Sequence, residues 1–165
     1  MERSMKRGAT PAIVAAEHAG ISFSVHEYEH DPNAPSFGLE AAQALGVPVE
    51  RVFKTLVALI DGTRYVVAVI PVAERLSLKA LAAAAGGKKA ELAQPASAER
   101  ITGYVVGGIS PLGQRKLLPT FLDQSALPYQ TIYVSAGRRG LDIELAPGDL
   151  MRLTKAGAAS LVQSS

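Results

Sequence analysis

The stretch RVFKTLVALIDGTRYVVAVIPV, residues 51–72, predicts a β-hairpin at the centre of the fold. Two apolar, β-branched runs flank Asp61-Gly62, and an Asp-Gly step between such runs is a strong signal for a hairpin turn. Side chains of a strand alternate between its two faces. Lys54 therefore shares a face with Leu56 and Ile60, and an ammonium group among aliphatic neighbours calls for an explanation.

Three explanations fit Lys54. It could discourage edge-to-edge pairing on an edge strand, or it could cover apolar surface with its stem while its head reaches water. It could also bind an anionic or carbonyl group in a pocket, with its pKa lowered by burial. The next run, YVVAVIPV, carries no charge for eight residues, which indicates that Lys54 is not at the outer rim of the sheet.

The rest of the chain mixes helical and strand patterns. Strands are joined by hairpins as well as crossovers, which favours a mixed α/β fold with a mostly antiparallel or mixed sheet and surrounding helices. A doubly wound parallel sheet is the alternative, but it needs more regular β–α alternation. We expect helices at about 11–20, 38–47, 78–87, 96–101 and 150–157, and strands at 21–30, 52–60, 65–72, 118–123, 130–135 and 141–145.

Length and composition bound the protein class. The 165 residues predict a single domain at residues 10–165. Residues 1–9 are basic but lack the apolar core of a signal peptide, so we expect a disordered extension there. The apolar runs are far shorter than the roughly 20 residues that cross a bilayer. The absence of cysteine removes disulfides and thiolate chemistry from this chain, and it suits a cytoplasmic protein.

Several catalytic motifs are missing. The sequence contains no HExxH zinc motif, no phosphate-binding loop with its lysine and no GxSxG elbow. His26 and His30 stand four residues apart, which on a strand is a separation of about 13 Å and too far to share a metal. We therefore expect neither a metal nor a cofactor.

Two weaker signals accompany Lys54. In LDIEL the alternation around Asp142 is that of an ordinary half-exposed strand, but a glycine-flanked turn, SAGRRG, precedes it and can bring Ser135 close to a ligand. The net charge is only +2, too small to indicate nucleic acid by itself. Basic pairs, which are usually solvated loops, occur at Lys88-Lys89, Arg115-Lys116 and Arg138-Arg139.

Taken together, the motifs resemble a known family. The segments FSVHEYEHDP, VFKTL, VAVIPV, TGYVVGGISPLGQ and IYVSAGRRGLDIEL, in this order and spacing, are similar to those of the YbaK-type Cys-tRNA(Pro) deacylases of the YbaK/ProX group. The resemblance runs from about Thr10 to Leu153. Two of its motifs are long and specific, which makes a chance match a poor explanation.

The resemblance implies a fold, a reaction and partners. The fold would be a twisted, largely antiparallel, barrel-like sheet surrounded by helices. The reaction would be trans-editing: hydrolysis of the ester that joins a wrong amino acid, cysteine, to the 3′ end of tRNA(Pro). The substrate's own thiol would attack its carbonyl and form a thiolactone. Mischarged tRNA(Pro) would be the partner, in the cytoplasm, together with prolyl-tRNA synthetase in one version of this hypothesis.

The resemblance also implies site residues. The lysine of the family falls on Lys54, which explains a cation among aliphatic side chains, because a low dielectric enlarges its interaction with a phosphate or carbonyl. The remaining family positions, catalytic and substrate-binding, fall on Tyr28, Ser135, Asp142, Phe37, Gly107 and Gly108. For the face that binds tRNA, the basic pairs supply Lys88, Lys89, Arg115, Lys116, Arg138 and Arg139.

Two other functions stay open on the sequence. One is a deacylase for another small residue, such as Ala-tRNA(Pro), because one methylene group changes binding by only about 1–3 kcal/mol. The other is a non-catalytic module that binds tRNA or a synthetase and keeps the fold. A panel of mischarged tRNAs distinguishes all three, and the oligomeric state is not fixed by any motif.

Overall fold

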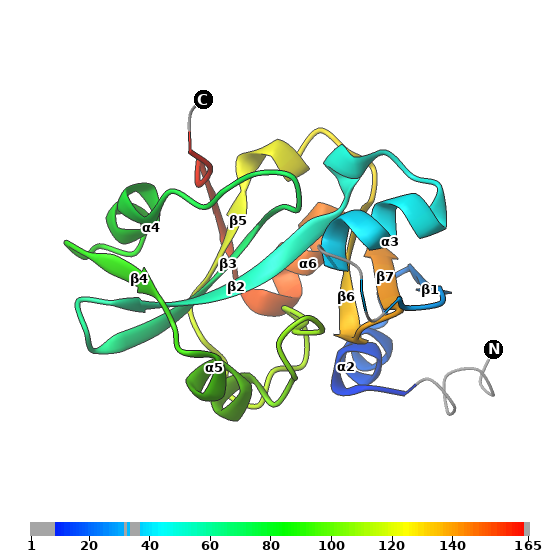
Figure 1. The fold of residues 1–165 in the computed structure, drawn as a ribbon, viewed down its shortest axis with the longest axis horizontal. Coiled ribbons are helices and arrows are strands. Elements are labelled where there is room, and N and C mark those ends of the chain that lie inside the picture. Colours follow the sequence, from blue (N-terminus) through cyan, green and yellow to red (C-terminus); the bar gives the residue numbers. More distant parts are fainter. Residues whose placement is uncertain (1–8, 32, 34–36, 164–165) are drawn as a thin grey trace.

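The computed structural model describes residues 9–31, 33 and 37–163 and contains two β-sheets with helices packed against them (Figure 1). Most of the expected extension 1–9, and part of the loop before residue 37, lie outside the described residues. One sheet, at the right in Figure 1, holds β1, β6 and β7, and the β2–β3 hairpin of the other extends to the left.

The larger sheet has five strands in the order β4-β2-β3-β5-β8. The hairpin expected around Asp61-Gly62 is confirmed, with Lys54 paired to Ile70 in an antiparallel register. β5 and β8 continue the sheet in parallel beside β3, so the sheet is mixed. The strands are β2 (Phe53–Ile60), β3 (Arg64–Pro71), β4 (Ala90–Leu92), β5 (Thr120–Asp123) and β8 (Gly157–Ala159).

The smaller sheet has three antiparallel strands in the order β1-β7-β6. It consists of β1 (Phe23–Glu27), β6 (Ile132–Arg138) and β7 (Leu141–Leu145). The register of the β6–β7 hairpin shifts between Ser135 and Arg138, because a bulge leads into the turn. Gly137 and Gly140 supply the positive φ values that this turn requires, 118° and 85°.

The barrel expected from the family resemblance does not form. The two sheets meet at a parallel bridge between Val52 and Tyr133, and they do not close into a cylinder within the described residues. The mixed, largely antiparallel character of the sheets is confirmed. We use the name seam for the Val52–Tyr133 bridge and the side chains beside it, because the two sheets are in contact there.

Local sequence signals place the helices. Thr10 caps α2 through its side-chain oxygen, which accepts from the Ile13 amide, and Ser77 caps α4 in the same way. Proline stands in the first turn of three helices, where its missing N–H costs nothing. The helices are α2 (Pro11–Ala19), α3 (Phe37–Leu45), α4 (Leu78–Ala84), α5 (Pro95–Thr102) and α6 (Pro147–Thr154), with short 3₁₀ turns η1 (Val49–Arg51) and η2 (Gln124–Ala126).

The two faces of β2 pack against different cores. Phe53 and Val57 join a core shared with α2, β6 and β7, whereas Leu56, Ala58 and Ile60 face a second core under α4. The alternation expected from the sequence is therefore correct. Of the described helices, none is both long and apolar enough to span a membrane.

One stretch of β2 keeps an open side. β4 pairs with β2 only from Ala58 to Ile60, so the preceding stretch, Phe53–Val57, has β3 on one side and no strand of a described ladder on the other. This open side creates the space in which the functional residues gather.

Candidate active site

A cavity of about 400 Å³ lies between the two sheets, next to the seam. Its floor is Val52 and the stretch Phe53–Val57 of β2, and its walls come from α3, α5, the loop after α5 and the β6–β7 hairpin. It brings together residues that the sequence resemblance singled out from five separate segments. These are Tyr28, Lys54, Gly107, Ser135 and Asp142, with Arg138 beside them.

The β6–β7 hairpin positions Ser135 and Asp142. The two residues face each other as an antiparallel pair, so their side chains lie on the same face of the sheet. Ser135 Oγ accepts a hydrogen bond from the Gly137 amide at 3.1 Å, which holds the start of the bulge. The hairpin thus presents a hydroxyl and a carboxyl to the cavity side by side.

Asp142 is the most perturbed acid of the cavity. Its side chain is only 6% exposed, so the half-exposed strand suggested by the LDIEL alternation is wrong at this position. Burial raises its pKa to about 7 because the charged carboxylate loses solvation. Among the described residues, no side chain is close enough to form an ion pair with it. A carboxyl in this state can exchange a proton near neutral pH.

Tyr28 stands directly after β1 and against the same hairpin. Its backbone amide donates to the Gly140 carbonyl at 3.0 Å, and a Cβ on Gly140 would lie 2.8 Å from the Tyr28 carbonyl oxygen. Burial, followed by the charge of Asp142, raises the pKa of Tyr28 to about 12. The phenol is therefore protonated at neutral pH and can donate a hydrogen bond beside Asp142.

Lys54 projects from the open stretch of β2 and is partly buried. Burial lowers its pKa, the charge of Arg75 lowers it further, and Glu74 opposes both. The ion pairs of the described residues do not include Lys54. This cation is held by the sheet and available to a ligand.

The glycine pair after α5 forms a wall of the site. Gly107 has a φ of 97° and lines the cavity, and Gly108 packs directly against the β6–β7 turn. A Cβ on Gly108 would lie 2.6 Å from Arg138 Cα and 3.0 Å from the Arg139 nitrogen. Only a residue without a side chain allows this approach of two backbones.

We expect Gly108→Ala to separate the loop from the β6–β7 turn. The obstacle is backbone rather than a flexible side chain, so the variant should lose about 1–3 kcal/mol of unfolding free energy and most of its activity. Urea denaturation and a deacylation assay measure the two effects. Gly148→Ala is the matched control, because nothing lies within 4 Å of its Cβ position; an unimpaired Gly108→Ala would contradict the close approach.

Other residues expected at the site are dispersed. Arg138 lines the cavity and Arg139 is exposed at the same turn, whereas Lys88 and Lys89 bind Asp61 through their amides at the distant hairpin tip. Arg115 and Lys116 are exposed on the loop near α5. Phe37 begins α3, but its side chain lies outside what the structure describes.

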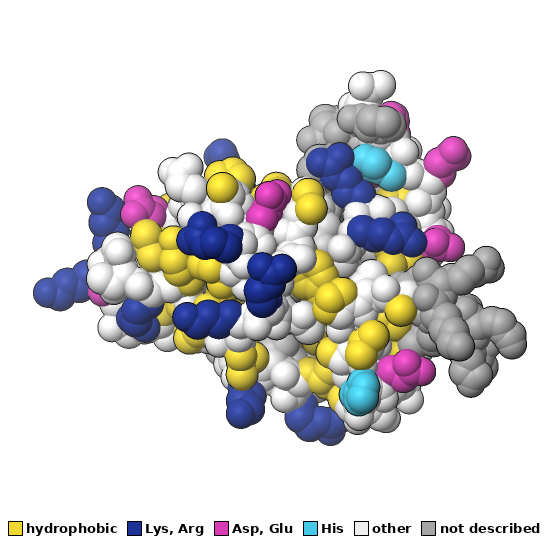
Figure 2. Space-filling view, turned by 90° about the horizontal axis from the view of Figure 1, so that it is seen from below, with side chains coloured by type: hydrophobic (Ala, Val, Ile, Leu, Met, Phe, Trp, Pro, Cys, Tyr) yellow, Lys and Arg dark blue, Asp and Glu magenta, His cyan; other side chains and the backbone are white. Residues whose placement is uncertain are grey.

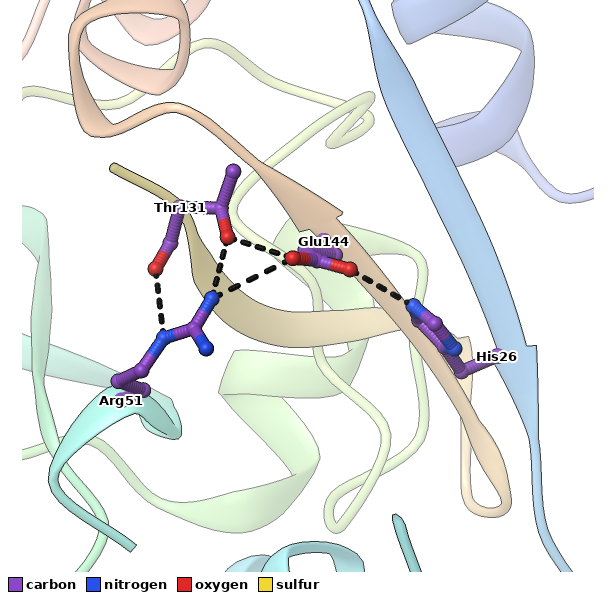
Figure 3. Close-up of polar contacts among 4 residues, drawn as sticks. All are labelled: His26, Arg51, Thr131 and Glu144. Carbon is purple, nitrogen blue, oxygen red and sulfur yellow. Dashed lines mark hydrogen bonds and ion pairs between the residues drawn. The ribbon is translucent and has the colours of Figure 1, made fainter. Parts of the chain in front are cut away.

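A polar network at the seam connects the two halves of the site (Figure 3). Glu144, on β7 two residues after Asp142, contacts His26 Nε2 at 3.0 Å and Arg51 Nη2 at 3.3 Å. Thr131 donates to Glu144 Oε2 and receives a hydrogen bond from Arg51, while Arg51 Nε donates to the Thr131 carbonyl. Arg51 also lies over the ring of Tyr133, 5.0 Å from its centroid.

The network favours a charged Glu144. Burial alone would raise its pKa, but hydrogen bonds from Thr131 and His26 outweigh burial and lower it. Arg51 stands three residues before Lys54, and Glu144 two residues after Asp142. The ion pair between Arg51 and Glu144 therefore links the segment that leads to Lys54 with the strand that carries Asp142.

Within residues 9–31, 33 and 37–163, no three His, Asp or Glu side chains are grouped so that they could hold a metal ion.

Comparison with known proteins shows the family to which the chain belongs. A model of the aminoacyl-tRNA editing domain matches residues 31–153, which include most of the cavity lining. The chain belongs to the aminoacyl-tRNA editing domain family. It is 44% identical, over 98% of both chains, to a provisionally named Cys-tRNA(Pro)/Cys-tRNA(Cys) deacylase, EbsC, of Enterococcus faecalis (strain ATCC 700802 / V583).

Solved structures share the fold of this editing domain. One is a protein described provisionally as a trans-editing enzyme for prolyl tRNA synthetase, with 27% identity, a TM-score of 0.83 and coverage of 93% of this chain and 96% of that one. Another is a hypothetical protein with 26% identity, a TM-score of 0.82 and coverage of 93% and 100%. The resemblance inferred from the motifs is confirmed.

Sequence reasoning missed several residues of this editing domain's cavity. Thr55 lines it, and its Oγ1 is buried with no hydrogen-bond partner among the described residues. Leu92 and Val106 also line it and remain largely exposed, which is unusual for large apolar side chains. Thr55 and Val106 lie inside the quoted segments VFKTL and TGYVVGGISPLGQ, but neither was singled out as a site residue, and Leu92 lies outside every quoted segment.

Proposed function

We propose that this protein is a trans-editing deacylase that removes cysteine from mischarged Cys-tRNA(Pro). The single observation that carries the proposal is the joint presence of a buried acid, Asp142, and a cation, Lys54, in one cavity of an aminoacyl-tRNA editing fold. No ion pair of the described residues includes Lys54. The name of the relative EbsC, Cys-tRNA(Pro)/Cys-tRNA(Cys) deacylase, supports cysteine as the amino acid. We regard residues 10–165 as one editing domain that acts in the cytoplasm, where aminoacyl-tRNA is made.

In the proposed reaction the substrate supplies the nucleophile. Asp142, whose pKa is raised to about 7, takes the proton of the cysteinyl thiol. The thiolate attacks the ester carbonyl, the bond between carbonyl carbon and ribose oxygen breaks, and the ribose oxygen receives the proton that Asp142 took from the thiol. The products are tRNA with a free 3′ end and a cysteine thiolactone, which water opens to cysteine. Holding thiol and carbonyl in contact is worth several kcal/mol of barrier.

Lys54 and the neighbouring donors orient the ester. An ammonium in a partly apolar pocket interacts strongly with the terminal phosphate or ribose, because the low dielectric enlarges the Coulomb energy. Lys54 is not the nucleophile in this scheme, since a Schiff base requires a ketone or aldehyde rather than an ester. Tyr28, protonated at neutral pH, and Ser135 are placed to donate hydrogen bonds to the carbonyl or ribose oxygens.

The end of the cavity toward α3 favours a small amino acid. Its lining includes Gly38, Ala41, Val52 and Val72, and the last three are nearly inaccessible to solvent. A Cβ on Gly38 would lie 2.2 Å from Val72 Cγ1, so α3 already packs tightly there. This narrow end accommodates a cysteinyl side chain and excludes bulky ones.

A panel of mischarged tRNA(Pro) substrates tests the proposal. We expect Cys-tRNA(Pro) to be hydrolysed much faster than Ser-tRNA(Pro) or Ala-tRNA(Pro), because neither serine nor alanine offers a thiol. The measurement is release of labelled amino acid, with and without prolyl-tRNA synthetase. Rapid Ala-tRNA(Pro) hydrolysis would overturn the thiol-assisted step, and binding of tRNA without turnover of any substrate would overturn the enzyme.

We further propose that mischarged tRNA approaches the face that carries α5. Figure 2 shows this face, where Lys and Arg side chains surround exposed hydrophobic ones. Arg138, at the cavity, and Arg115 and Lys116, near α5, are exposed and could neutralise phosphates. Prolyl-tRNA synthetase remains a candidate partner that the assay above examines.

A further inference from the structure

The cavity is larger than an amino acid requires and has two unlike ends. A volume of about 400 Å³ falls in the range that holds a drug-sized ligand, which is the size of an aminoacyl-nucleoside rather than of cysteine alone. The end near α3 is closed by buried side chains, as described above. The other end lies between β2, β4 and α5, and we call it the open arm.

The open arm is apolar and reaches solvent. Leu92 is 55% exposed and Val106 is 40% exposed, yet both line the cavity, together with Pro95. The Val106 amide donates to Glu99 Oε2 at 2.9 Å, which holds this residue against α5. Exposed aliphatic side chains on the rim of a cavity are suited to the face of a flat, apolar ring.

The distance along β2 matches the substrate. Leu92 pairs with Ala58, which is four residues beyond Lys54, a separation of about 13 Å along the strand. A tRNA esterified at its 3′ end must leave the cavity through the side that opens to solvent. The reacting ester would then lie at Lys54 and Asp142, and the nucleoside that carries it would point toward Leu92.

Thr55 adds polar groups within this arm. Its hydroxyl oxygen is buried and has no hydrogen-bond partner among the described residues, although most buried hydroxyls have one. Odd-numbered residues of β2 direct their backbone groups away from β3, as the bond from the Ala93 amide to the Val57 carbonyl demonstrates. The backbone of Thr55 therefore faces the open side of the strand, where β4 has not yet begun.

We propose that the open arm binds the 3′-terminal nucleoside of the acylated tRNA. The base lies against Leu92 and Val106, and the ribose or base forms hydrogen bonds with Thr55. Arg138, whose exposed side chain pairs with Glu27 at 3.2 Å, exchanges that partner for the adjoining phosphate. This inference rests on the proposed function for the identity of the ligand, but binding of a nucleotide can be measured without any turnover.

The experiment uses the full chain and AMP as the probe. We expect AMP to inhibit Cys-tRNA(Pro) deacylation competitively and to bind the wild-type protein directly in calorimetry. Leu92→Ser and Val106→Ser should each raise KM and the Kd for AMP about fivefold to tenfold, with kcat within about twofold, because they remove contact with the base only. Leu127→Ser, an equally exposed leucine outside the cavity lining, should change neither.

The outcomes separate this inference from the proposed function. Active wild-type protein that AMP neither binds nor inhibits, with KM unchanged in both variants, would overturn the open-arm site. The other outcome is that the wild-type protein binds AMP and both variants bind it more weakly, but the wild-type protein hydrolyses no aminoacyl-tRNA. This result would support the nucleoside site and overturn the proposed deacylase function. We expect both variants to keep the wild-type melting temperature, because Leu92 and Val106 are both exposed at the surface.

Discussion

Lys54→Ala should lower kcat/KM for Cys-tRNA(Pro) by at least about 100-fold, the loss typical for removal of one preorganised charged or polar group from an active site. The ammonium lies partly buried on the open stretch of β2, and no described residue forms an ion pair with it. Within the described residues its charge is therefore not committed to a carboxylate, and alanine offers the substrate no charge in its place. Single-turnover release of labelled cysteine measures the change.

Two comparisons make the Lys54 result specific. Lys54→Arg keeps the charge but changes its shape and should restore part of the activity. Lys79→Ala removes a lysine from α4, outside the cavity lining, and should leave deacylation unchanged. Wild-type rates in Lys54→Ala, at an unaltered melting temperature, would show that the cation does not take part in the reaction.

Asp142→Asn should abolish deacylation almost completely and also change its pH dependence. In the wild-type protein the carboxylate is the active form, and burial raises its pKa to about 7. The rate should therefore rise as the pH increases toward 7 and level off above it. The variant cannot accept the thiol proton, so its residual rate should lack this rise. A wild-type profile that is flat between about pH 5 and pH 8 would contradict the assignment of Asp142 as the base.

The same substitution should stabilise the fold at high pH. The folded-state pKa of Asp142 is raised from its ordinary value of 3.8 to about 7, so its contribution to stability is present below 3.8 and is lost as the pH rises through 7. Asparagine never acquires the buried charge. Relative to wild type, Asp142→Asn should gain up to about 4 kcal/mol of unfolding free energy at about pH 8, measured by urea denaturation.

Asp123 provides the contrasting case for that measurement. It is 2% exposed, like Asp142, but its carboxylate accepts hydrogen bonds from the Leu161 amide at 2.8 Å and from the amide and hydroxyl of Ser125. Asp123→Asn replaces one accepting oxygen by an NH₂ group, so that a donor now bonded to Asp123 loses its acceptor. The substitution should therefore destabilise the protein. Equal effects of the two substitutions would show that the absence of an ion-pair partner for Asp142 among the described residues has no energetic consequence.

Much of the fold could be predicted because its signals are local. The Asp-Gly step, the β-branched runs and the helix caps at Thr10 and Ser77 depend on neighbours in the sequence, and each expected element formed. Two strands were missed. β4 has only three residues, two of them exposed, and β8 is Gly-Ala-Ala, which has no β-branched side chain. Their pairing depends on distant strands.

The site was predictable only in part for the same reason. Asp142 seemed half-exposed because alternation within one strand does not reveal that a second layer covers its polar face. Tyr28, Lys54, Ser135 and Asp142 could be grouped only through a resemblance to a family, since they come from four separate segments. Thr55 stands beside Lys54 in VFKTL without a pattern that sets it apart, Leu92 lies in no quoted segment, and the setting of both follows from where β4 begins.

The seam offers a means of redesign. The two reactive groups belong to different sheets, and the Arg51–Glu144 ion pair with Thr131 sets the gap between them from outside the cavity lining. Altering the length of a side chain there would widen or narrow the gap without replacing any residue of the cavity. Engineering the enzyme to accept bulkier amino acids could thus begin at positions outside the cavity lining.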